Sequence, residues 1–559
     1  MQRKLFVLIL ILLAVVIQSE ISVYAQDAGE EHVKGELLVK FYSDAYDSEV
    51  ALVIKALNGR IIKKFRIVGN LLHIQLPENL TVINAISLLK RNTVVEYAEP
   101  NYIRYATTVP NDPGFSYLWG LNNTGQTGGT VDADIDAPRA WDITTGSTNN
   151  VIAVIDTGVD MTHEDLSTNI WTNPGEIPGN GIDDDHNGYI DDVHGWDFYN
   201  NDNDPSDTNR CKHGTHVSGT IGAIGNNGKG VTGVNWDVKI MPLRFLGGFL
   251  CSGSDANAIK AIEYATEKGV RISNNSWGGG GYNRALEDAI RNSEMIFVAA
   301  AGNGGRDGIG DNNDGANPEY PASYPLDNII SVAATDHNDL RASFSNYGLA
   351  SVDLAAPGVK IASTIPGNKY AYFDGTSMAT PHVSGVVGLL LSQNPVLENW
   401  QAIWKILQGV DKKGLPVLSG GRLNAYNSLI LPDPSETRSE EGVLTYSGTW
   451  NDYTNPNFSN GVVKYSNQKN ATASILFSGS GVMWIASRDN RLGKADVYID
   501  GNYEKPVDLY SPTIIHQEVV YSNLALSSGN HSMSIVVKGE KNPSATNTFV
   551  DIDAIDVVH

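Results

Sequence analysis

Three short stretches of the chain carry residue types that could act together in nucleophilic catalysis. Ser377 lies in FDGTSMATPHVSG, just before an apolar run with helical character. Asp156 ends the apolar stretch NNVIAVID, and His213 opens HGTHVSGTIGA. A serine hydroxyl needs an adjacent base, an imidazole can supply it, and a buried carboxylate can orient the imidazole. Taken alone, Ser377 is more simply explained as a helix cap.

The stretches around these residues predict an α/β domain over residues 110–431. Apolar strand-like stretches such as VKIMPLRF, MIFVAAAGN and IISVAATD alternate with helical ones such as SDANAIKAIEYATEKG. The strands are apolar on both faces, which is typical of a parallel sheet flanked by helices on each side. A helix that begins beside Ser377 would offer N–H groups and a positive dipole end to a developing oxyanion.

Five motifs together resemble those of secreted subtilisin-like serine proteases of the thermitase kind. They occur in the order DTGVD, HGTHVSGT, NNSWGG, AAAGNGG and GTSMATPHVSG, and the resemblance extends over residues 33–431. The stretch GTSMA lacks the second glycine of the Gly-x-Ser-x-Gly turn found in α/β-hydrolases. The resemblance implies that Ser377 is the nucleophile, His213 the acid–base group and Asp156 the orienting carboxylate. His216, in the same HGTH motif, could alternatively form a two-histidine metal pair, but no third ligand is evident.

The resemblance also implies an oxyanion hole. Asn303 in AAAGNGG would donate its side-chain N–H next to the backbone N–H of Ser377. For a lone Asn-Gly pair, a simple turn is the alternative.

A substrate cleft is implied by two further segments. Ser276, Trp277 and Gly278 would line one side, and Ser252 and Gly253 would line the other. A protein or peptide substrate would then bind as an added β-strand through main-chain hydrogen bonds. A role in the core is the alternative for Trp277, and the two roles are compatible.

Glu319 in EYPASYP would lie, by the same resemblance, at the base of the primary specificity pocket. A carboxylate there would favour Lys or Arg before the scissile bond through a charge-assisted hydrogen bond. If Glu319 points to solvent or to a loop instead, a broad apolar or aromatic preference is expected.

Calcium is the expected cofactor, in a structural role. The resemblance places one site at Asp112, Asp165 and Asn227. A second candidate comes from DDDHNGYIDD, where Asp183, Asp185 and Asn187 precede a glycine as in the first half of an EF-hand loop. His194 stands where the twelfth-position acid of that loop should be, so the match is partial. A solvated acidic loop is the alternative.

The two cysteines of the chain are expected to pair. Cys211 lies two residues before His213, and Cys251 lies just before the SGS segment. In an exported protein two cysteines usually form a disulfide, and the resemblance puts both beside the cleft. The alternative is two free thiols packed as small hydrophobes.

The N-terminus predicts export. Arg3 and Lys4 precede an apolar run too short to span a bilayer, and VYA at 23–25 offers a cleavage site, so residues 1–25 are expected to be a secretory signal peptide and the mature protein extracellular. A retained anchor is the alternative. No later apolar run could span a membrane, and the net charge of −23 argues against nucleic acid or an anionic membrane as partner.

Further modules flank the α/β region. Residues 27–106 have the order βαββαβ and resemble the inhibitory propeptide of these proteases. Residues 432–441 are polar and contain prolines, which predicts a linker, and 442–559 show the short-strand spacing of an all-β sandwich. That tail weakly resembles carbohydrate-binding modules, so a polysaccharide or cell-surface ligand is expected, with Trp450, Tyr453 and Tyr503 as candidate contacts.

Taken together, these features predict a secreted, calcium-stabilised serine endopeptidase made as a self-processing zymogen, with its own propeptide as inhibitor. One rival is a catalytically inactive binding protein that kept the fold. Another gives the tail the main role, in adhesion. The intact set Asp156, His213, Asn303 and Ser377 argues against the first rival.

Overall fold

The computed structural model describes residues 32–102, 108–208, 210–305 and 307–559. The expected signal peptide lies outside these ranges, as does Arg104, a basic residue near the end of the propeptide at which self-cleavage is expected. The chain divides into two compact units, Met1–Ala106 and Thr107–His559. Among the described helices, none is long and apolar enough to cross a membrane.

The first unit has the βαββαβ order expected from the sequence. Its antiparallel sheet has the order β2-β3-β1-β4, and side chains such as Leu37, Ile74 and Val82 form its core. The elements are β1 (His32–Phe41), α2 (Asp47–Ala56), β2 (Arg60–Lys64), β3 (Leu71–Gln75), α3 (Val82–Leu89) and β4 (Val95–Tyr102).

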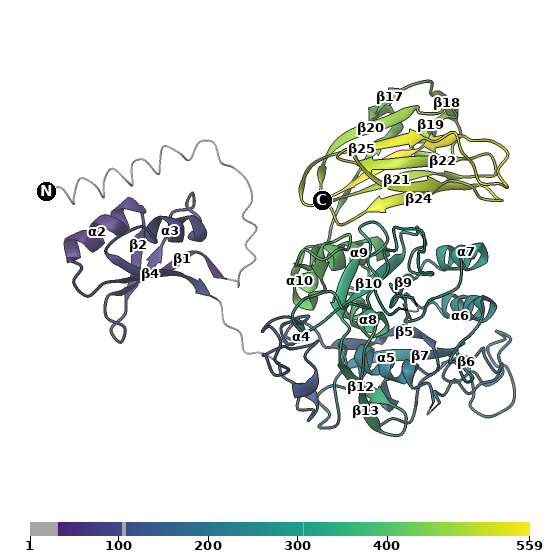
Figure 1. Ribbon diagram of the computed structural model, residues 1–559, viewed down its shortest axis with the longest axis horizontal. Coiled ribbons are helices and arrows are strands. Elements are labelled where there is room, and N and C mark those ends of the chain that lie inside the picture. The colour runs from purple at the N-terminus through teal and green to yellow at the C-terminus, as the bar shows by residue number, and fades with distance from the viewer. Residues whose placement is uncertain (1–31, 103–107, 209, 306) are drawn as a thin grey trace. The chain divides into compact units, whose positions relative to one another are not determined.

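A sheet of nine strands organises the α/β part of the second unit, in the order β14-β15-β11-β10-β9-β8-β5-β7-β6 (Figure 1). Its strand pairs are parallel except β14 with β15, as expected for strands that are apolar on both faces. The strands are β5 (Gly146–Asp156), β6 (Trp196–Asp197), β7 (Asp237–Arg244), β8 (Ile272–Asn275), β9 (Ile296–Ala300), β10 (Ile329–Thr335), β11 (Leu354–Pro357), β14 (Asp411–Lys412) and β15 (Gly421–Arg422).

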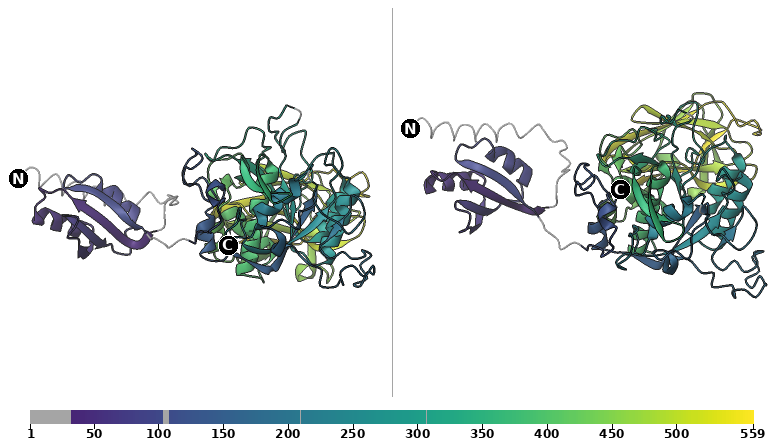
Figure 2. Two further views of the ribbon diagram at one scale, coloured as in Figure 1. Left: turned by 90° about the horizontal axis from the view of Figure 1, so that it is seen from below. Right: turned by 60° about the horizontal axis from the view of Figure 1, so that its bottom comes forward.

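Each face of this sheet is covered by its own set of helices, seen from two further directions in Figure 2. Alternate residues of β5 show the division, because Ile152 and Val154 join one apolar cluster while Ala153 and Ile155 join the other. The helices are α4 (Ala137–Trp141), α5 (His213–Gly222), α6 (Asp255–Glu267), α7 (Arg284–Ser293), α8 (Thr376–Gln393), α9 (Asn399–Gln408) and α10 (Ala425–Ile430). Helix α8 is buried along most of its length and contacts β5, β8, β9 and β10. A hairpin of β12 (Ile361–Ile365) and β13 (Lys369–Phe373) packs beside α5.

The C-terminal part is all-β, and its first strand corrects the expected linker. Residues 436–440 are not a linker but strand β16 (Glu436–Glu440), which pairs with β27 because its backbone completes the edge of that sheet. Three antiparallel sheets enclose a core that includes Trp484 and Tyr521. The other strands are β17 (Thr445–Ser447), β18 (Asn451–Thr454), β19 (Val462–Ser466), β20 (Thr472–Gly479), β21 (Gly481–Arg488), β22 (Lys494–Ile499), β23 (Asn502–Asp508), β24 (Ile515–Asn523), β25 (Gly529–Val537), β26 (Val550–Ile552) and β27 (Ala554–Val558).

This β-module packs directly on the α/β part. Trp404 on α9 donates its indole N–H to Ser480, and Gln408 donates to the carbonyls of Ser480 and Leu524. Met483 and Ile485 of β21 join the same apolar cluster as α8 and α9. The short stretch between α10 and β16 therefore does not separate two independent bodies.

Candidate active site

Asp156, His213 and Ser377 all lie at element ends. Asp156 is the last residue of β5, His213 is the first residue of α5, and Ser377 is the second residue of α8. Helices α5 and α8 contact one another, and both contact β5. The carboxyl ends of parallel strands share one edge of a sheet, which is where α/β folds build their sites.

His213 and Asp156 form a tight pair. Nδ1 of His213 lies 2.8 Å from Oδ1 and 3.0 Å from Oδ2 of Asp156, so the ring donates this N–H to the carboxylate. The Asp156 side chain is fully buried, while the His213 side chain is 27% exposed. Burial opposes the charged imidazolium, but the charge and hydrogen bond of Asp156, with the charge of Asp207, outweigh it and raise the pKa of His213 above 6.5.

Ser377 is held by reciprocal hydrogen bonds with Ser276. The Ser377 hydroxyl donates to the Ser276 carbonyl at 3.0 Å, and the Ser276 hydroxyl donates to the Ser377 carbonyl at 2.9 Å. The Ser377 proton therefore points at a main-chain oxygen, and rotation about its side chain is needed to offer it to His213.

Asn303 is fixed by the start of α8. Its Oδ1 accepts the Thr376 backbone N–H at 2.8 Å and the Thr376 hydroxyl at 3.0 Å. With the oxygen occupied in this way, the side-chain NH₂ points away from Thr376. Asn303 is exposed, so this NH₂ group is accessible to a bound substrate.

The two expected cleft segments differ in how their backbones are used. Ser252 pairs through both its N–H and its carbonyl with Gly247, at 3.0 Å each, so its main chain already belongs to a turn. Gly253 and Gly278 are exposed. Trp277 packs on Phe245 and belongs with the apolar cluster of α6 and α7, as the core alternative anticipated.

The Glu319 side chain lies next to Gly278 of the cleft segment and to Gly302, which precedes Asn303. A β-carbon added at Gly278 would lie 2.6 Å from Glu319 Oε1, and one at Gly302 would lie 3.0 Å from its Cγ. Both glycines thus leave the space that the Glu319 side chain fills. Burial, with the charge of Asp311, raises the pKa of the Glu319 carboxyl.

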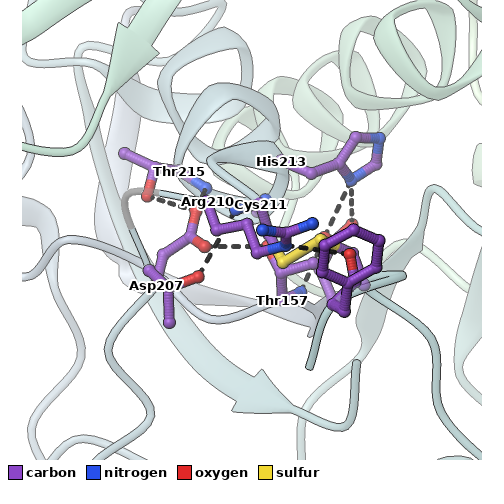
Figure 3. The surroundings of a disulfide bond; sticks show 11 residues. Thr157, Asp207, Arg210, Cys211, His213 and Thr215 are labelled. Carbon is purple, nitrogen blue, oxygen red and sulfur yellow. Dashed lines mark hydrogen bonds and ion pairs between the residues drawn. A yellow bond between two sulfur atoms is a disulfide. The ribbon is translucent and has the colours of Figure 1, made fainter. Parts of the chain in front are cut away.

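Asp207 is a site residue that the sequence analysis missed (Figure 3). Its Oδ1 accepts the Thr157 hydroxyl at 3.1 Å, and its Oδ2 accepts the Thr215 hydroxyl at 2.8 Å and the Thr215 N–H at 3.1 Å. It therefore ties the residue after Asp156 to the first turn of α5. Burial raises the pKa of Asp207 to about 6, against its hydrogen bonds from Thr215 and Thr157. No pattern in DPSDTN distinguishes this aspartate from a solvated acid.

The expected disulfide between Cys211 and Cys251 is present, with Cα atoms 5.8 Å apart (Figure 3). It links the segment before His213 to the turn before Ser252. Next to it, Arg210 donates to the Phe249 carbonyl at 2.9 Å and lies 3.7 Å from the centroid of the Phe249 ring. The two loops beside α5 are thus joined covalently and by stacking.

His216 does not form a metal pair with His213. Its Nε2 lies 3.0 Å from the Ile361 carbonyl and 3.1 Å from the Ala371 carbonyl, and its ring stacks on Phe373. Burial lowers the pKa of His216 to about 3, so the ring is neutral. It joins α5 to the β12–β13 hairpin.

Asp112, Asp165 and Asn227 come together although they are distant in the sequence. The Asp112 carboxylate accepts the backbone N–H of Asn227 at 3.1 Å, and Asn227 Nδ2 donates to Asp165 Oδ1 at 2.9 Å. Asp165 Oδ2 also accepts the Tyr370 hydroxyl. Burial, with the charge of Asp165, raises the pKa of Asp112 against the backbone hydrogen bonds it accepts.

Two family models match the chain. The Subtilase family matches residues 147–412, a span that contains Asp156, His213, Asn303 and Ser377. The Fervidolysin N-terminal prodomain matches residues 18–101.

Curated relatives agree with these models. The chain is 37% identical to Thermophilic serine proteinase of Bacillus sp. strain AK1, over 71% of this chain and 88% of that protein. It is 38% identical to Thermitase of Thermoactinomyces vulgaris, over 57% of this chain and 99% of that protein. Fervidolysin of Fervidobacterium pennivorans is 32% identical over 68% of this chain and 55% of its own length. The chain therefore belongs to the subtilase family and is a subtilisin-like serine protease with an N-terminal prodomain.

Proposed function

We propose that the protein is a secreted, calcium-stabilised serine endopeptidase made as a zymogen that processes itself. The observation that carries this proposal is the His213–Asp156 pair at the start of α5, with Ser377 at the start of the buried helix α8 that contacts α5. Secretion rests on the signal-like residues 1–25, which lie outside the described ranges.

In the proposed reaction, Ser377 Oγ attacks the scissile carbonyl while His213 Nε2 takes its proton. Asp156 holds the ring through Nδ1 and stabilises the imidazolium. The oxyanion binds the Asn303 amide and the N–H of Ser377, which lies in the first turn of α8 where N–H groups lack intrahelical partners. His213 then protonates the leaving amine, and the acyl-enzyme is hydrolysed by a water activated in the same way.

For specificity, we propose that the substrate pairs with the backbone near Gly253 on one side and Gly278 on the other. Glu319 forms the base of the pocket for the residue before the scissile bond, and its half-buried carboxylate favours Lys or Arg. The contacts of Glu319 with Gly278 and Gly302 support this assignment.

For stability, we propose calcium at Asp112, Asp165 and Asn227. Two carboxylates converge on Asn227 there, Asp112 at its backbone N–H and Asp165 at its side chain. Oxygen ligands on loops suit Ca²⁺. In this structure the Asn227 NH₂ group bridges to Asp165, the interaction that a cation would replace once the amide turns its Oδ1 inward. The bound ion would fasten the segment at Asp112 to the loop after α5.

For the flanking modules, we propose that the prodomain inhibits the enzyme until cleavage between residues 104 and 110. We also propose a polysaccharide or cell-surface ligand for residues 442–559, supported by Tyr453 and Tyr503, each 53% exposed. Trp450 is less available, because it packs on Tyr446 and donates its N–H to Ser447.

The decisive experiment expresses the wild type beside Ser377→Ala in a protease-free host and compares intact masses. The wild type is expected to lose the prodomain and to react with a serine-directed fluorophosphonate, whereas the variant stays full-length and unlabelled. Equal maturation of both proteins would exclude self-processing. An unlabelled but folded and matured wild type would instead favour the inactive binding protein.

A further inference from the structure

A loop between the 3-10 turn Ser167–Asn169 and β6 is built around carboxylates, away from the catalytic residues. The Asn187 N–H donates to Asp183 Oδ1 at 3.0 Å and to Asp185 Oδ1 at 3.2 Å. The Gly188 N–H donates to Asp183 Oδ2 at 2.8 Å. The first half of the expected calcium loop is thus folded around the Asp183 carboxylate.

The second half of that loop departs from the EF-hand pattern. His194, at the twelfth position, has its Nδ1 2.8 Å from the Trp171 carbonyl. The Asn187 side chain accepts the Tyr189 N–H at 2.7 Å and donates to Asp192 at 2.8 Å, so both of its polar atoms have partners within the loop. A metal site here needs an acid from elsewhere.

Glu176 supplies that acid. It is only 8% exposed, and its Oε1 accepts the N–H groups of Asp184 at 3.0 Å and Asp185 at 3.3 Å. Its Oε2 is buried and has no hydrogen-bond partner among the described residues. Carboxylate oxygens of Glu176, Asp183 and Asp185 all lie within 4.8 Å of one another. A buried, unpartnered carboxylate oxygen among other carboxylates is costly unless a cation compensates it.

Among the described residues, no neighbouring cation pairs with the Glu176 carboxylate. Lys268 pairs with Asp185 Oδ2 and, at 3.6 Å, with Asp192. Within the described ranges, neither Glu176 nor Asp183 has an ion pair with Lys268. Gly175 lets the backbone before Glu176 come close, because a β-carbon there would lie 2.7 Å from the Asp185 Cβ. By contrast, both oxygens of the buried Asp134, in the Asp132–Asp136 acidic group, accept backbone N–H bonds.

We propose that Glu176, Asp183 and Asp185 bind a Ca²⁺ ion, with Glu176 replacing the missing twelfth-position acid. Three carboxylates on loops suit Ca²⁺ better than Mg²⁺, which demands stricter geometry and keeps more water. The ion holds the loop against α6, because Asp192 in the same loop accepts the Tyr264 hydroxyl of that helix. This site is separate from the calcium proposed at Asp112 and Asp165, and it deepens the proposed calcium stabilisation.

The test uses full-length Ser377→Ala, which cannot digest itself. Glu176→Gln is added to this background, and Glu263→Gln, an exposed acid on α6, is the matched control. Native mass spectrometry counts bound Ca²⁺ after exchange into calcium. Tb³⁺ luminescence excited through tyrosine and tryptophan, with Tyr189 in this loop and Tyr370 beside Asp165, is compared between the variants.

Glu176→Gln is expected to lose one Ca²⁺ per chain and part of the Tb³⁺ signal, while Glu263→Gln keeps the full ion count and signal. In chelator, Glu176→Gln is expected to melt no lower than its parent, because glutamine removes a buried uncompensated charge. Asp183→Asn must lose the same ion, which keeps the proposal testable if one variant fails to fold. An unchanged ion count in either folded variant overturns it. Because Ser377 is absent throughout, that failure leaves the protease proposal untouched.

Discussion

The carboxylate of Asp207 is expected to raise the pKa of His213 without contacting its side chain. It reaches the His213–Asp156 pair through Thr157, whose N–H donates to Asp156 at 2.7 Å and whose hydroxyl donates to Asp207 at 3.1 Å. Its negative charge raises the pKa of His213. Asp207→Asn removes that charge, so the pKa of His213 should fall.

The size of this fall follows from the arrangement. A charge in direct contact shifts a pKa by about 1–3 units. Because Thr157 lies between Asp207 and the His213–Asp156 pair, a shift of about 0.5–1 unit in the pKa of His213 is expected. The pKa of Asp207 is about 6, so its charge is largely present where His213, above 6.5, titrates. Ionising Asp207 in the folded state, against an ordinary pKa of 3.8, costs about 3 kcal/mol above pH 6, a cost that is absent below about pH 4. Asparagine removes this cost but leaves Thr215 short of an acceptor, about 1–3 kcal/mol, so stability at neutral pH should change little.

The assay is kcat/KM against pH with a peptide amide that does not ionise between pH 5 and 9. The acidic limb of Asp207→Asn should lie about 0.5–1 pH unit below that of the wild type. Asp204→Asn, which removes an exposed charge three residues earlier, should leave the limb in place. If the limbs of folded Asp207→Asn and wild type coincide, Asp207 has no electrostatic role at His213.

Other changes address the oxyanion hole, specificity, calcium and the disulfide. Asn303→Ala should lower kcat about 10²–10³-fold with little change in KM, the loss measured for the equivalent donor in subtilisin; a loss below about tenfold in steady-state kinetics would exclude its role. Glu319→Gln should weaken cleavage after Lys and Arg in a peptide library, and an unchanged profile would mean that another residue sets the preference. Asp165→Asn should remove most of the fall in melting temperature that chelator causes in the wild type, as measured by calorimetry; an equal fall in both proteins would place calcium elsewhere. Replacing Cys211 and Cys251 by serine should cost about 4 kcal/mol in urea unfolding, given their sequence separation of 40, and a loss below about 1 kcal/mol would contradict this.

Local patterns were sufficient to predict the fold class and to propose the central residues of the site. The strands around Asp156 and Ala300 are apolar at successive positions, so a parallel sheet buried on both faces could be predicted. Ser377 and His213 stand at the starts of small-residue helices within short motifs that occur in a fixed order. The sequence also led to the pairing of Cys211 with Cys251, because an exported chain with two cysteines leaves one possible intramolecular bond.

The errors arose where a segment's role depends on its neighbours. Residues 436–440 are polar and follow two prolines, yet they form a strand because β27 offers an open edge. The sequence left Trp277 open between a cleft role and a core role, and the structure shows its ring packed on Phe245 against the apolar cluster.

The sequence by itself determined the α/β class, the motifs that carry the proposed catalytic residues, and the disulfide, because each is encoded by periodicity, by a short motif or by composition. Only the tertiary structure decided which acidic side chains lie next to the proposed catalytic residues and next to one another. Asp207 meets Thr157 across 50 residues and Thr215 across eight, and Glu176 closes a loop that begins at Asp183. Such partners share no spacing rule, because burial and close packing of distant segments bring their carboxylates together, and that depends on the whole fold.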